Sequence, residues 1–284
     1  MKILVTGYTG QLGFDVVNHG VKCGLDMVGV GLNDLDITNE NAVNQYIKLL
    51  NPDAIIHCAA YTAVDKAEDD KTSCWNVNVE GTKHLVHTAR EINAKFMYIS
   101  TDYVFNGQGN EPFVEVDVPN PIGYYGLTKY EGEKVVKQIL EDWFIVRISW
   151  VFGVNGNNFI KTMLRLAETR SELNVVGDQY GSPTYTFDLA RLLIDMIQTE
   201  KYGIYHASNE GSCSWAEFAQ EIFRQANVGA KVNSISTEEY PTRAVRPKNS
   251  RMSKQKLIDN GFVPLPKWQD ALEHYLNELT QEVK

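Results

Sequence analysis

Two side chains in the stretch 123–134, Tyr125 and Lys129, have the types and the spacing that carbonyl reduction requires. If this stretch, GYYGLTKYEGEK, is helical, they lie one turn apart on the same face. A free phenol has a pKa of about 10, and a nearby ammonium favours the phenolate and so makes the phenol a stronger acid. Beside a nicotinamide ring, such a phenol can give its proton to the alkoxide that forms as hydride reaches a carbonyl carbon.

A second pair with the same spacing, Tyr130 and Lys134, follows directly. Surface helices often carry a Tyr-Lys pair only as part of a solvated face, so the spacing alone is weak support for catalysis. The helix expected after residue 121 should bring its first turn to the end of a sheet, and Tyr125 and Lys129 lie in that first turn and a half. We therefore favour the first pair.

A glycine-rich turn, GYTGQLG at 7–13, follows the short β-prone run Ile3–Thr6. Glycines at 7, 10 and 13 permit a tight turn and the close approach of a pyrophosphate, and the N–H groups of the next helix favour the anion. Apolar residues at helical spacing follow at 14, 17 and 21. The order strand, glycine turn, helix predicts a dinucleotide site rather than an ordinary loop.

The residues after the second expected strand, Met27–Val30, bear on which nicotinamide cofactor binds. An acid there would accept from the ribose 2′-hydroxyl of NADH, whereas a basic residue would favour the 2′-phosphate of NADPH. Gly31, Leu32 and Asn33 offer neither group. Asp36 follows and could reach the adenosine side, but it could equally belong to a helix start. These residues alone leave the cofactor preference open.

Two further strand ends are expected at the same crevice, because the carboxyl ends of parallel strands line the ligand site of an open α/β sheet. The segment 59–62 follows the buried strand Ala54–Cys58, and its small residues suit either close approach to a cofactor or tight packing. Ser100 and Thr101 follow the strand expected over 95–100. A hydroxyl there can stabilise a developing charge or simply cap a turn.

Length and charge narrow the classes of function. The 284 residues suffice for one large α/β domain or for two unequal domains that share a cleft. A net charge of -9 and a pI near 5.2 argue against binding nucleic acid or an anionic membrane surface. The four cysteines are widely spaced and suggest neither a metal site nor a disulfide framework. Without a signal-peptide pattern or an apolar run of about 18 residues, we expect a cytoplasmic protein.

Hydrophobic periodicity predicts the remaining elements. Helices are expected over 42–50, 73–92, 157–169, 188–197, 215–226 and 268–278, and strands over 144–151 and 204–207. We expect the helix at 188–197 and the strand at 204–207 to return to the nucleotide-binding part. The predicted domains are therefore a dinucleotide-binding domain, 1–151 and 185–208, and a second domain, 152–184 and 209–284.

Together the motifs resemble the extended short-chain dehydrogenase/reductase family. The likeness runs through GYTGQLG, AYTAVDKAE at 60–68, STDYVFNG at 100–107, YGLTKYEGEK at 125–134, SWVFG at 149–153, NNFIKTMLRLA at 157–167, GDQYGSPT at 177–184 and RPKNSRM at 246–252. Within that family the chain is most similar to enzymes that reduce the 4-keto group of a thymidine-diphosphate sugar in the last step of dTDP-L-rhamnose synthesis. The resemblance implies a Rossmann-type, doubly wound parallel sheet with a smaller, discontinuous substrate domain.

The resemblance also implies roles for individual residues. Tyr125 would be the proton donor, Lys129 the cofactor ribose ligand that tunes it, and Thr101 the hydroxyl that assists. The cofactor would contact Gly7, Gly10, Gln11, Leu12, Gly13, Asp36, Ile37, Ala60, Tyr61 and Thr62, together with Tyr125 and Lys129. The nucleotide sugar would contact Thr101, Asp102, Trp150, Asn158 and Arg246.

Three of the substrate candidates also have plain structural readings. Asn158 can bind a pyrimidine edge or a sugar hydroxyl, or it can cap its helix. Arg246 can fork onto a diphosphate or remain a surface residue, and Trp150 can stack on a ring or fill core. We expect NADPH, with NADH use open. The residues indicate no metal, although the resemblance is compatible with Mg²⁺ and with a homodimer.

Two alternatives stay open. An epimerase or dehydratase on the same scaffold is one, but the dehydratases carry an Asp-Glu pair where Asp102 is followed here by Tyr103. The other is a non-catalytic NADP-binding subunit such as the β subunit of methionine adenosyltransferase, which resembles these reductases. Because Thr101, Tyr125 and Lys129 are all present, we favour the enzyme.

Overall fold

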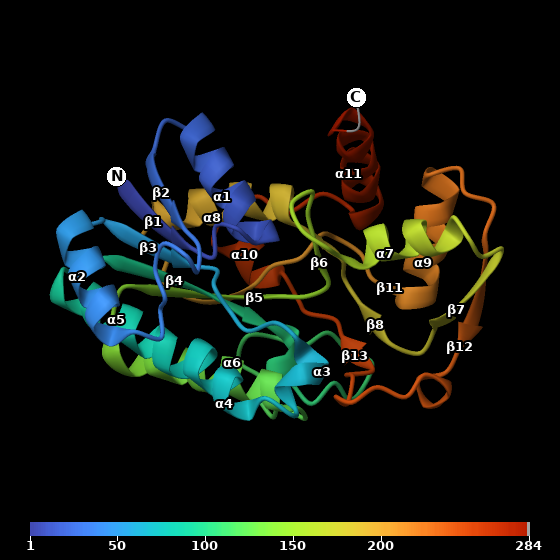
Figure 1. Cartoon of the computed structure of the whole chain (residues 1–284), viewed down its shortest axis with the longest axis horizontal. Coiled ribbons are helices and arrows are strands. Elements are labelled where there is room, and N and C mark those ends of the chain that lie inside the picture. Colours follow the sequence, from blue (N-terminus) through green and yellow to red (C-terminus); the bar gives the residue numbers. More distant parts are fainter. Residues whose placement is uncertain (283–284) are drawn as a thin grey trace.

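A parallel sheet of six strands forms the centre of the larger part of the molecule (Figure 1). The structure is a computed structural model and describes residues 1–282. The strands follow the order β10-β5-β4-β3-β1-β2, and their bounds are β1 Lys2–Thr6, β2 Asp26–Val30, β3 Ala54–His57, β4 Lys95–Thr101, β5 Trp143–Ile148 and β10 Gly203–His206. The central residues of the four inner strands are apolar and buried, because helices cover both faces of a parallel sheet.

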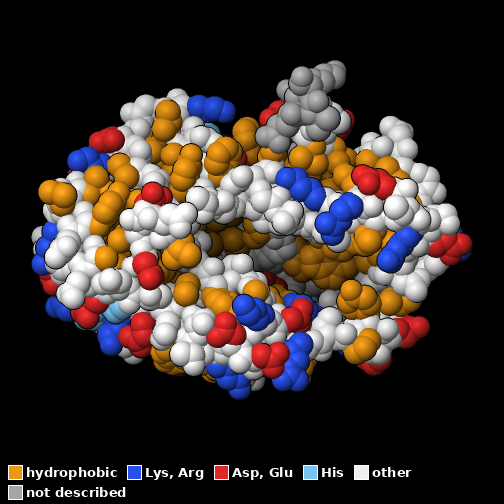
Figure 2. All heavy atoms as spheres, in the orientation of Figure 1, with side chains coloured by type: hydrophobic (Ala, Val, Ile, Leu, Met, Phe, Trp, Pro, Cys, Tyr) orange, Lys and Arg blue, Asp and Glu red, His pale blue; other side chains and the backbone are white. Residues whose placement is uncertain are grey.

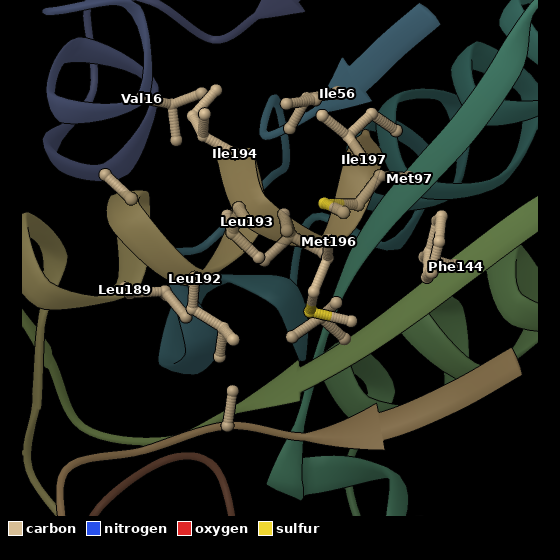
Figure 3. Close-up of a cluster of buried hydrophobic side chains, with 14 of the residues drawn as sticks. Val16, Ile56, Met97, Phe144, Leu189, Leu192, Leu193, Ile194, Met196 and Ile197 are labelled. Atoms are coloured by element: carbon tan, nitrogen blue, oxygen red, sulfur yellow. The ribbon is translucent and has the colours of Figure 1, made fainter. Parts of the chain in front are cut away.

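Helices cover both faces of this sheet (Figure 1). One face carries α1 (Gln11–Lys22) and α8 (Thr186–Ile197), and the other carries α2 (Glu40–Leu50), α5 (Thr82–Glu91) and α6 (Tyr124–Ile139). The apolar side of α8 meets side chains of α1, β3, β4 and β5 in a closely packed core (Figure 3). The predicted doubly wound α/β fold is confirmed.

The chain changes direction across the sheet next to β1. From β1 it passes to the edge strand β2, and then it returns to the other side of β1 to form β3. Strand connections that leave in opposite directions open a crevice at the carboxyl ends of the two strands, and ligands of open α/β sheets bind there. The glycine turn and the segment 59–62 both begin at this point.

A smaller part of the molecule lies beyond the carboxyl ends of the strands and has its own core (Figure 1). Its strand pairs are β6 (Val151–Phe152) with β9 (Thr184–Tyr185) and β7 (Glu172–Val176) with β12 (Lys231–Ile235), while β8 (Tyr180–Gly181) lies between β11 (Cys213–Ser214) and β13 (Asn249–Ser250). The helices that pack on them are α7 (Phe159–Ala167), α9 (Trp215–Gln225) and α11 (Trp268–Glu282). Short helical segments elsewhere are α3 (Val64–Ala67), α4 (Lys71–Trp75), α10 (Gln255–Asp259), η1 (Asn76–Gly81), η2 (Asp102–Val104) and η3 (Thr237–Glu239).

Two predicted elements are interrupted. The strand expected over 144–151 ends at Ile148, because Trp150 adopts a left-handed backbone conformation with φ 48° before the chain resumes as β6. The helix expected over 73–92 starts at Lys71 and contains a π-helical turn, η1, between α4 and α5. Both irregularities lie beside the crevice. Single π-helical turns within α-helices are often found at functional sites.

Candidate active site

A cavity of about 690 Å³ opens at the carboxyl ends of the strands, between the two parts of the molecule. Figure 2 shows it as the hollow near the middle of the molecule. Its walls include most of the residues that the sequence predicted for the site: Gly7, Gly10, Gln11, Leu12, Gly13, Asp36, Ile37, Ala60, Tyr61, Thr62, Thr101, Asp102, Tyr125, Lys129 and Trp150. Two predicted residues, Asn158 and Arg246, are not among the lining residues.

The glycine turn leaves no room for side chains. Gly7 has φ 73°, and a Cβ there would lie 2.6 Å from the backbone nitrogen of Ala59. A Cβ on Gly13 would lie 2.4 Å from the carbonyl oxygen of Gly7. The backbone of this turn is therefore exposed to the cavity at the start of α1, where free N–H groups and the helix dipole favour an anion. The turn fits the pyrophosphate of a dinucleotide.

Two carboxylates that follow β2, those of Asp34 and Asp36, accept hydrogen bonds from nearby backbone groups. Asp34 accepts a hydrogen bond from the backbone N–H of Gly31 at 2.8 Å. Asp36 accepts from the backbone N–H and the hydroxyl of Thr38, at 2.9 and 2.7 Å. Asp36 still lines the cavity, so it stabilises a turn before α2 and also faces the expected adenosine side.

The π-helical turn positions the segment that follows β3. Asn78 is buried, and its side chain pairs with Tyr61 by accepting from the backbone N–H at 2.8 Å and donating to the carbonyl at 3.2 Å. The same amide donates to the hydroxyl of Thr128 on α6 at 3.0 Å. Asn78 thus ties the cofactor wall to the helix that carries Tyr125. The sequence analysis did not predict this role of Asn78, because it expected a regular helix over 73–92 and no π-helical turn at this position.

Tyr125 and Thr101 meet at the crevice. Tyr125 lies in the first turn of α6, whose backbone N–H at Tyr124 donates to a carboxylate oxygen of Glu68 at 2.7 Å. The hydroxyl of Thr101, at the end of β4, is hydrogen-bonded to the phenol of Tyr125 and also donates to Asp102 at 3.0 Å. The predicted pair of hydroxyls is therefore assembled on the glycine-lined cavity.

Burial dominates the acidity of Tyr125 in the protein by itself, and the predicted effect of Lys129 stays a prediction. Burial, followed by the charge of Asp102, raises the pKa of Tyr125, while the hydrogen bond from Thr101 lowers it. Burial also lowers the pKa of Lys129 to about 7, against the opposing effect of Glu133. The ammonium lies 4.0 Å from the centre of the Tyr98 ring. In both groups desolvation has the largest effect on the pKa.

Asp102 is a buried carboxylic acid at the cavity wall. It is only 4% exposed, and its Oδ2 has no hydrogen-bond partner among the described residues. Burial raises its pKa to about 6, although hydrogen bonds from Ser250 and Thr101 lower it. A buried oxygen without a partner is costly in a folded protein, so this one is available to a polar ligand group in the cavity.

A bidentate ion pair lies beneath α6. Arg147 on β5 donates to both carboxylate oxygens of Glu133 on α6, at 2.8 and 2.7 Å, and Ser100 donates to the same carboxylate at 2.6 Å. All three residues are fully buried or nearly so. The sequence reasoning missed this network because an Arg in a strand and a Glu in a helix give no signal of pairing until the fold brings them together.

Trp150 reaches the cavity, whereas Asn158 does not. The indole of Trp150 stacks on Trp215 with ring centroids 3.6 Å apart and planes 12° apart. Asn158 caps α7 by accepting from the backbone N–H of Lys161 at 3.1 Å, and it donates to the side chain of Gln11 at 3.1 Å. The capping reading is confirmed, and Asn158 also contacts the glycine turn, while its contact with substrate stays a prediction.

Arg246 is held at the edge of the site rather than on its wall. It pairs with Asp65 on α3 and donates to the hydroxyl of Tyr103 at 3.1 Å. Tyr103 lines the cavity and packs edge-on against Tyr125, with centroids 5.6 Å apart. The sequence analysis considered Tyr103 only because the dehydratases carry a glutamate at this place. Its aromatic contact with Tyr125 could not be predicted from the spacing of the two residues.

A family model described as the RmlD substrate binding domain matches residues 1–281. The chain belongs to this family. It is 40% identical to a dTDP-4-dehydrorhamnose reductase from Aggregatibacter actinomycetemcomitans, over 96% of this chain and 97% of the relative. It is 39% identical to the spore coat polysaccharide biosynthesis protein SpsK from Bacillus subtilis, over 98% and 97%. A crystal structure of dTDP-4-dehydrorhamnose reductase from Bacillus anthracis in complex with NADP superposes with a TM-score of 0.95 at 44% identity, covering 98% of this chain and 100% of that one.

Membership of the RmlD family agrees with the resemblance read from the motifs. Among residues 1–282, no helix is long and apolar enough to cross a membrane. In the same part of the chain, no group of three or more His, Cys, Asp or Glu side chains is placed to hold a metal ion.

Proposed function

We propose that this RmlD family member is a dTDP-4-dehydrorhamnose reductase, which uses NADPH to reduce the 4-keto group of dTDP-4-dehydro-L-rhamnose to dTDP-L-rhamnose. One observation supports this most: Tyr125, Thr101 and Lys129 line the same cavity as the glycine turn. A proton donor and a pyrophosphate site on one wall are what carbonyl reduction by a nicotinamide cofactor needs.

Each of these residues has a definite task in the proposed reaction. The exposed backbone of the glycine turn binds the pyrophosphate, and the bound nicotinamide supplies hydride to the carbonyl carbon. Tyr125 gives its proton to the carbonyl oxygen as negative charge develops there. The Thr101 hydroxyl, which donates to Asp102 beforehand, turns to donate to the phenolate that remains, and the Lys129 ammonium stabilises that negative charge.

The choice of NADPH rests on the relatives more than on the residues. The relative from Bacillus anthracis has NADP bound, which favours the phosphorylated cofactor here. In the described part of the chain, Lys129 is the one cationic side chain lining the cavity, and the end of β2 adds none. The 2′-phosphate would therefore be met by backbone N–H groups and by Thr9, so we expect some use of NADH.

The remaining parts of the proposal concern substrate and organisation. We assign the sugar nucleotide to the side of the cavity with Asp102 and Trp150, and we place Arg246 at its edge. The proposed domains are 1–151 with 185–208 for the dinucleotide, and 152–184 with 209–284 for the sugar nucleotide. A cytoplasmic location and a homodimer belong to the proposal as well, and it assigns no role to Mg²⁺.

The test mixes the purified protein with NADPH and dTDP-4-dehydro-L-rhamnose and follows the near-ultraviolet absorbance of NADPH. We expect the absorbance to fall, and the Tyr125→Phe variant to lose at least about a hundredfold in kcat because it has no proton to donate. Tyr130→Phe is the matched control, since it removes the hydroxyl of the other Tyr-Lys pair and should keep full activity.

Two results would contradict the proposal. Full activity in Tyr125→Phe would remove the proposed proton donor. Binding of NADPH without oxidation in the presence of the ketosugar would instead favour the non-catalytic regulatory subunit. Comparing dTDP- and UDP-linked ketosugars in the same assay tests the assigned nucleotide.

A further inference from the structure

Tyr98 lies under the part of α6 that carries Lys129. It belongs to β4, is fully buried, and points from the sheet toward the helix. Its hydroxyl donates to the backbone carbonyl of Lys129 at 3.3 Å, while the Lys129 ammonium is 4.0 Å from the centre of the Tyr98 ring. One tyrosine therefore contacts both the backbone and the charged end of the same lysine.

The helix approaches Tyr98 this closely because residue 132 is a glycine. A Cβ at Gly132 would lie 2.2 Å from the Tyr98 hydroxyl oxygen and 2.9 Å from the carbonyl oxygen of Asn78. Glycine within a helix is unfavourable by about 1 kcal/mol relative to alanine. The contact between the ring and the lysine is thus part of close packing that only glycine permits.

Of the other ionisable groups near Lys129, Glu133 has the largest effect, because its charge raises the pKa of the ammonium against the effect of burial. These groups come from α6 (Tyr125, Glu133), from β3 and its end (His57, Cys58) and from α4 (Cys74), in addition to Tyr98 on β4. Burial raises the pKa of Cys58 to about 12 and raises that of Cys74, so both thiols are neutral near pH 7. Burial keeps His57 neutral by lowering its pKa, and the Glu133 carboxylate is already paired with Arg147.

We propose that Tyr98 is a positioning residue for the reaction, whose ring face holds the Lys129 ammonium at the cavity wall. The inference depends on the proposed function, since it assigns Tyr98 a task through Lys129. A cation over the face of an aromatic ring is attracted by the negative charge above the ring, and this attraction strengthens away from water. Both partners here are buried, with Lys129 only 3% exposed.

The experiment changes the charge above the ring and leaves its shape nearly unchanged. Tyr98→Phe keeps the ring and removes the hydroxyl, whereas pentafluorophenylalanine at position 98 also withdraws electron density from the ring face. The pH profile of kcat/KM for NADPH oxidation and the pH dependence of the Kd for NADPH are measured for each. Tyr98→Met, which fills the space without a ring, is a further variant.

We expect Tyr98→Phe to keep the wild-type pH profile. With the fluorinated ring and with methionine, Lys129 should lose its proton at lower pH, so kcat/KM should fall about tenfold on the alkaline side while changing little on the acid side. A purely structural role would reduce activity equally at every pH. Thermal unfolding of each variant separates a loss of stability from a shift of the profile.

The outcomes separate this inference from the proposed function. If the wild-type protein oxidises NADPH and the fluorinated and methionine variants share its pH profile, Tyr98 is only a packing residue and the inference is wrong. If the wild-type protein binds NADPH without turnover, the proposed function fails. The pH dependence of the Kd then still decides whether the ring holds the ammonium.

Discussion

Replacing Gly132 by alanine tests whether the catalytic helix must lie against the sheet as closely as the structure shows. Gly132 is on the buried side of α6, between Lys129 and Glu133. The added methyl group would lie 2.2 Å from the hydroxyl oxygen and 2.8 Å from Cζ of Tyr98. Tyr98 is fully buried, so its ring has no open space into which it can turn.

The expected effect has two opposing parts. Alanine favours a helix over glycine by about 1 kcal/mol. Forcing a methyl group into a packed interior costs roughly 1–3 kcal/mol, because carbon atoms pack at roughly 3.5 Å and α6 must move by about 1 Å. We therefore expect the free energy of unfolding to fall by about 0–2 kcal/mol. We expect kcat to fall far more, on the order of 10²-fold, since a displacement of about 1 Å misplaces Tyr125.

The two quantities are measured separately, stability by urea unfolding and kcat from NADPH oxidation at saturating substrate. The double variant Gly132→Ala with Tyr98→Phe removes the hydroxyl oxygen that the new methyl group meets, so it should recover part of the lost kcat. A Gly132→Ala protein with full activity and higher stability would show that helix propensity dominates. The close approach of α6 to β4 would then be unnecessary for catalysis.

Three further predictions concern charges and contacts around the cavity. Burial raises the pKa of Asp102 to about 6, so its contribution to stability is full below about pH 4 and is lost as pH rises through 6. The free energy of unfolding of the wild-type protein, measured in urea, should therefore decline by roughly 3 kcal/mol across that window. Asp102→Asn should flatten this decline. Glu133→Gln should lower the free energy of unfolding by about 3–5 kcal/mol because it leaves the guanidinium of Arg147 buried without a counter-charge, and adding Arg147→Met should restore much of it. Asn155→Ala removes hydrogen bonds to two carbonyls of the glycine turn, at 2.9 and 3.2 Å. We expect the free energy of unfolding to fall by less than about 1 kcal/mol and the Kd for NADPH to rise several-fold. An unchanged Kd would show that this loop does not support cofactor binding.

The regular elements of the larger sheet could be read from the sequence because each is a simple local pattern. The glycine turn after β1 and the apolar spacing of α8 both gave the right element in nearly the right place. The short strands of the smaller part, such as β8 and β11, were not predicted. Strands of two residues carry too little alternation to be recognised, and their pairing depends on contacts distant in the sequence.

The candidate site was predictable for side chains at the end of a strand or in the first turns of a helix that begins at the crevice. Tyr125, Thr101 and Lys129 follow from their types and from the rule that strand ends meet at one crevice. Tyr98 and the Glu133–Arg147 pair did not, because each depends on which side chains face one another between a helix and a sheet. The large effect of burial on the pKa of Tyr125 was not predicted either, since burial could not be weighed against charge before the fold was known.

The position of Tyr125 depends on how α6 is held rather than on the tyrosine itself. Glu68 accepts from the first backbone N–H of the helix, and Asn78 binds Thr128 one turn later. These two contacts come from separate segments of the chain, so a change in either of them should move the phenol relative to the glycine turn and lower kcat before it unfolds the protein. Activity in this family member should therefore be more sensitive than stability to substitutions on the buried side of α6.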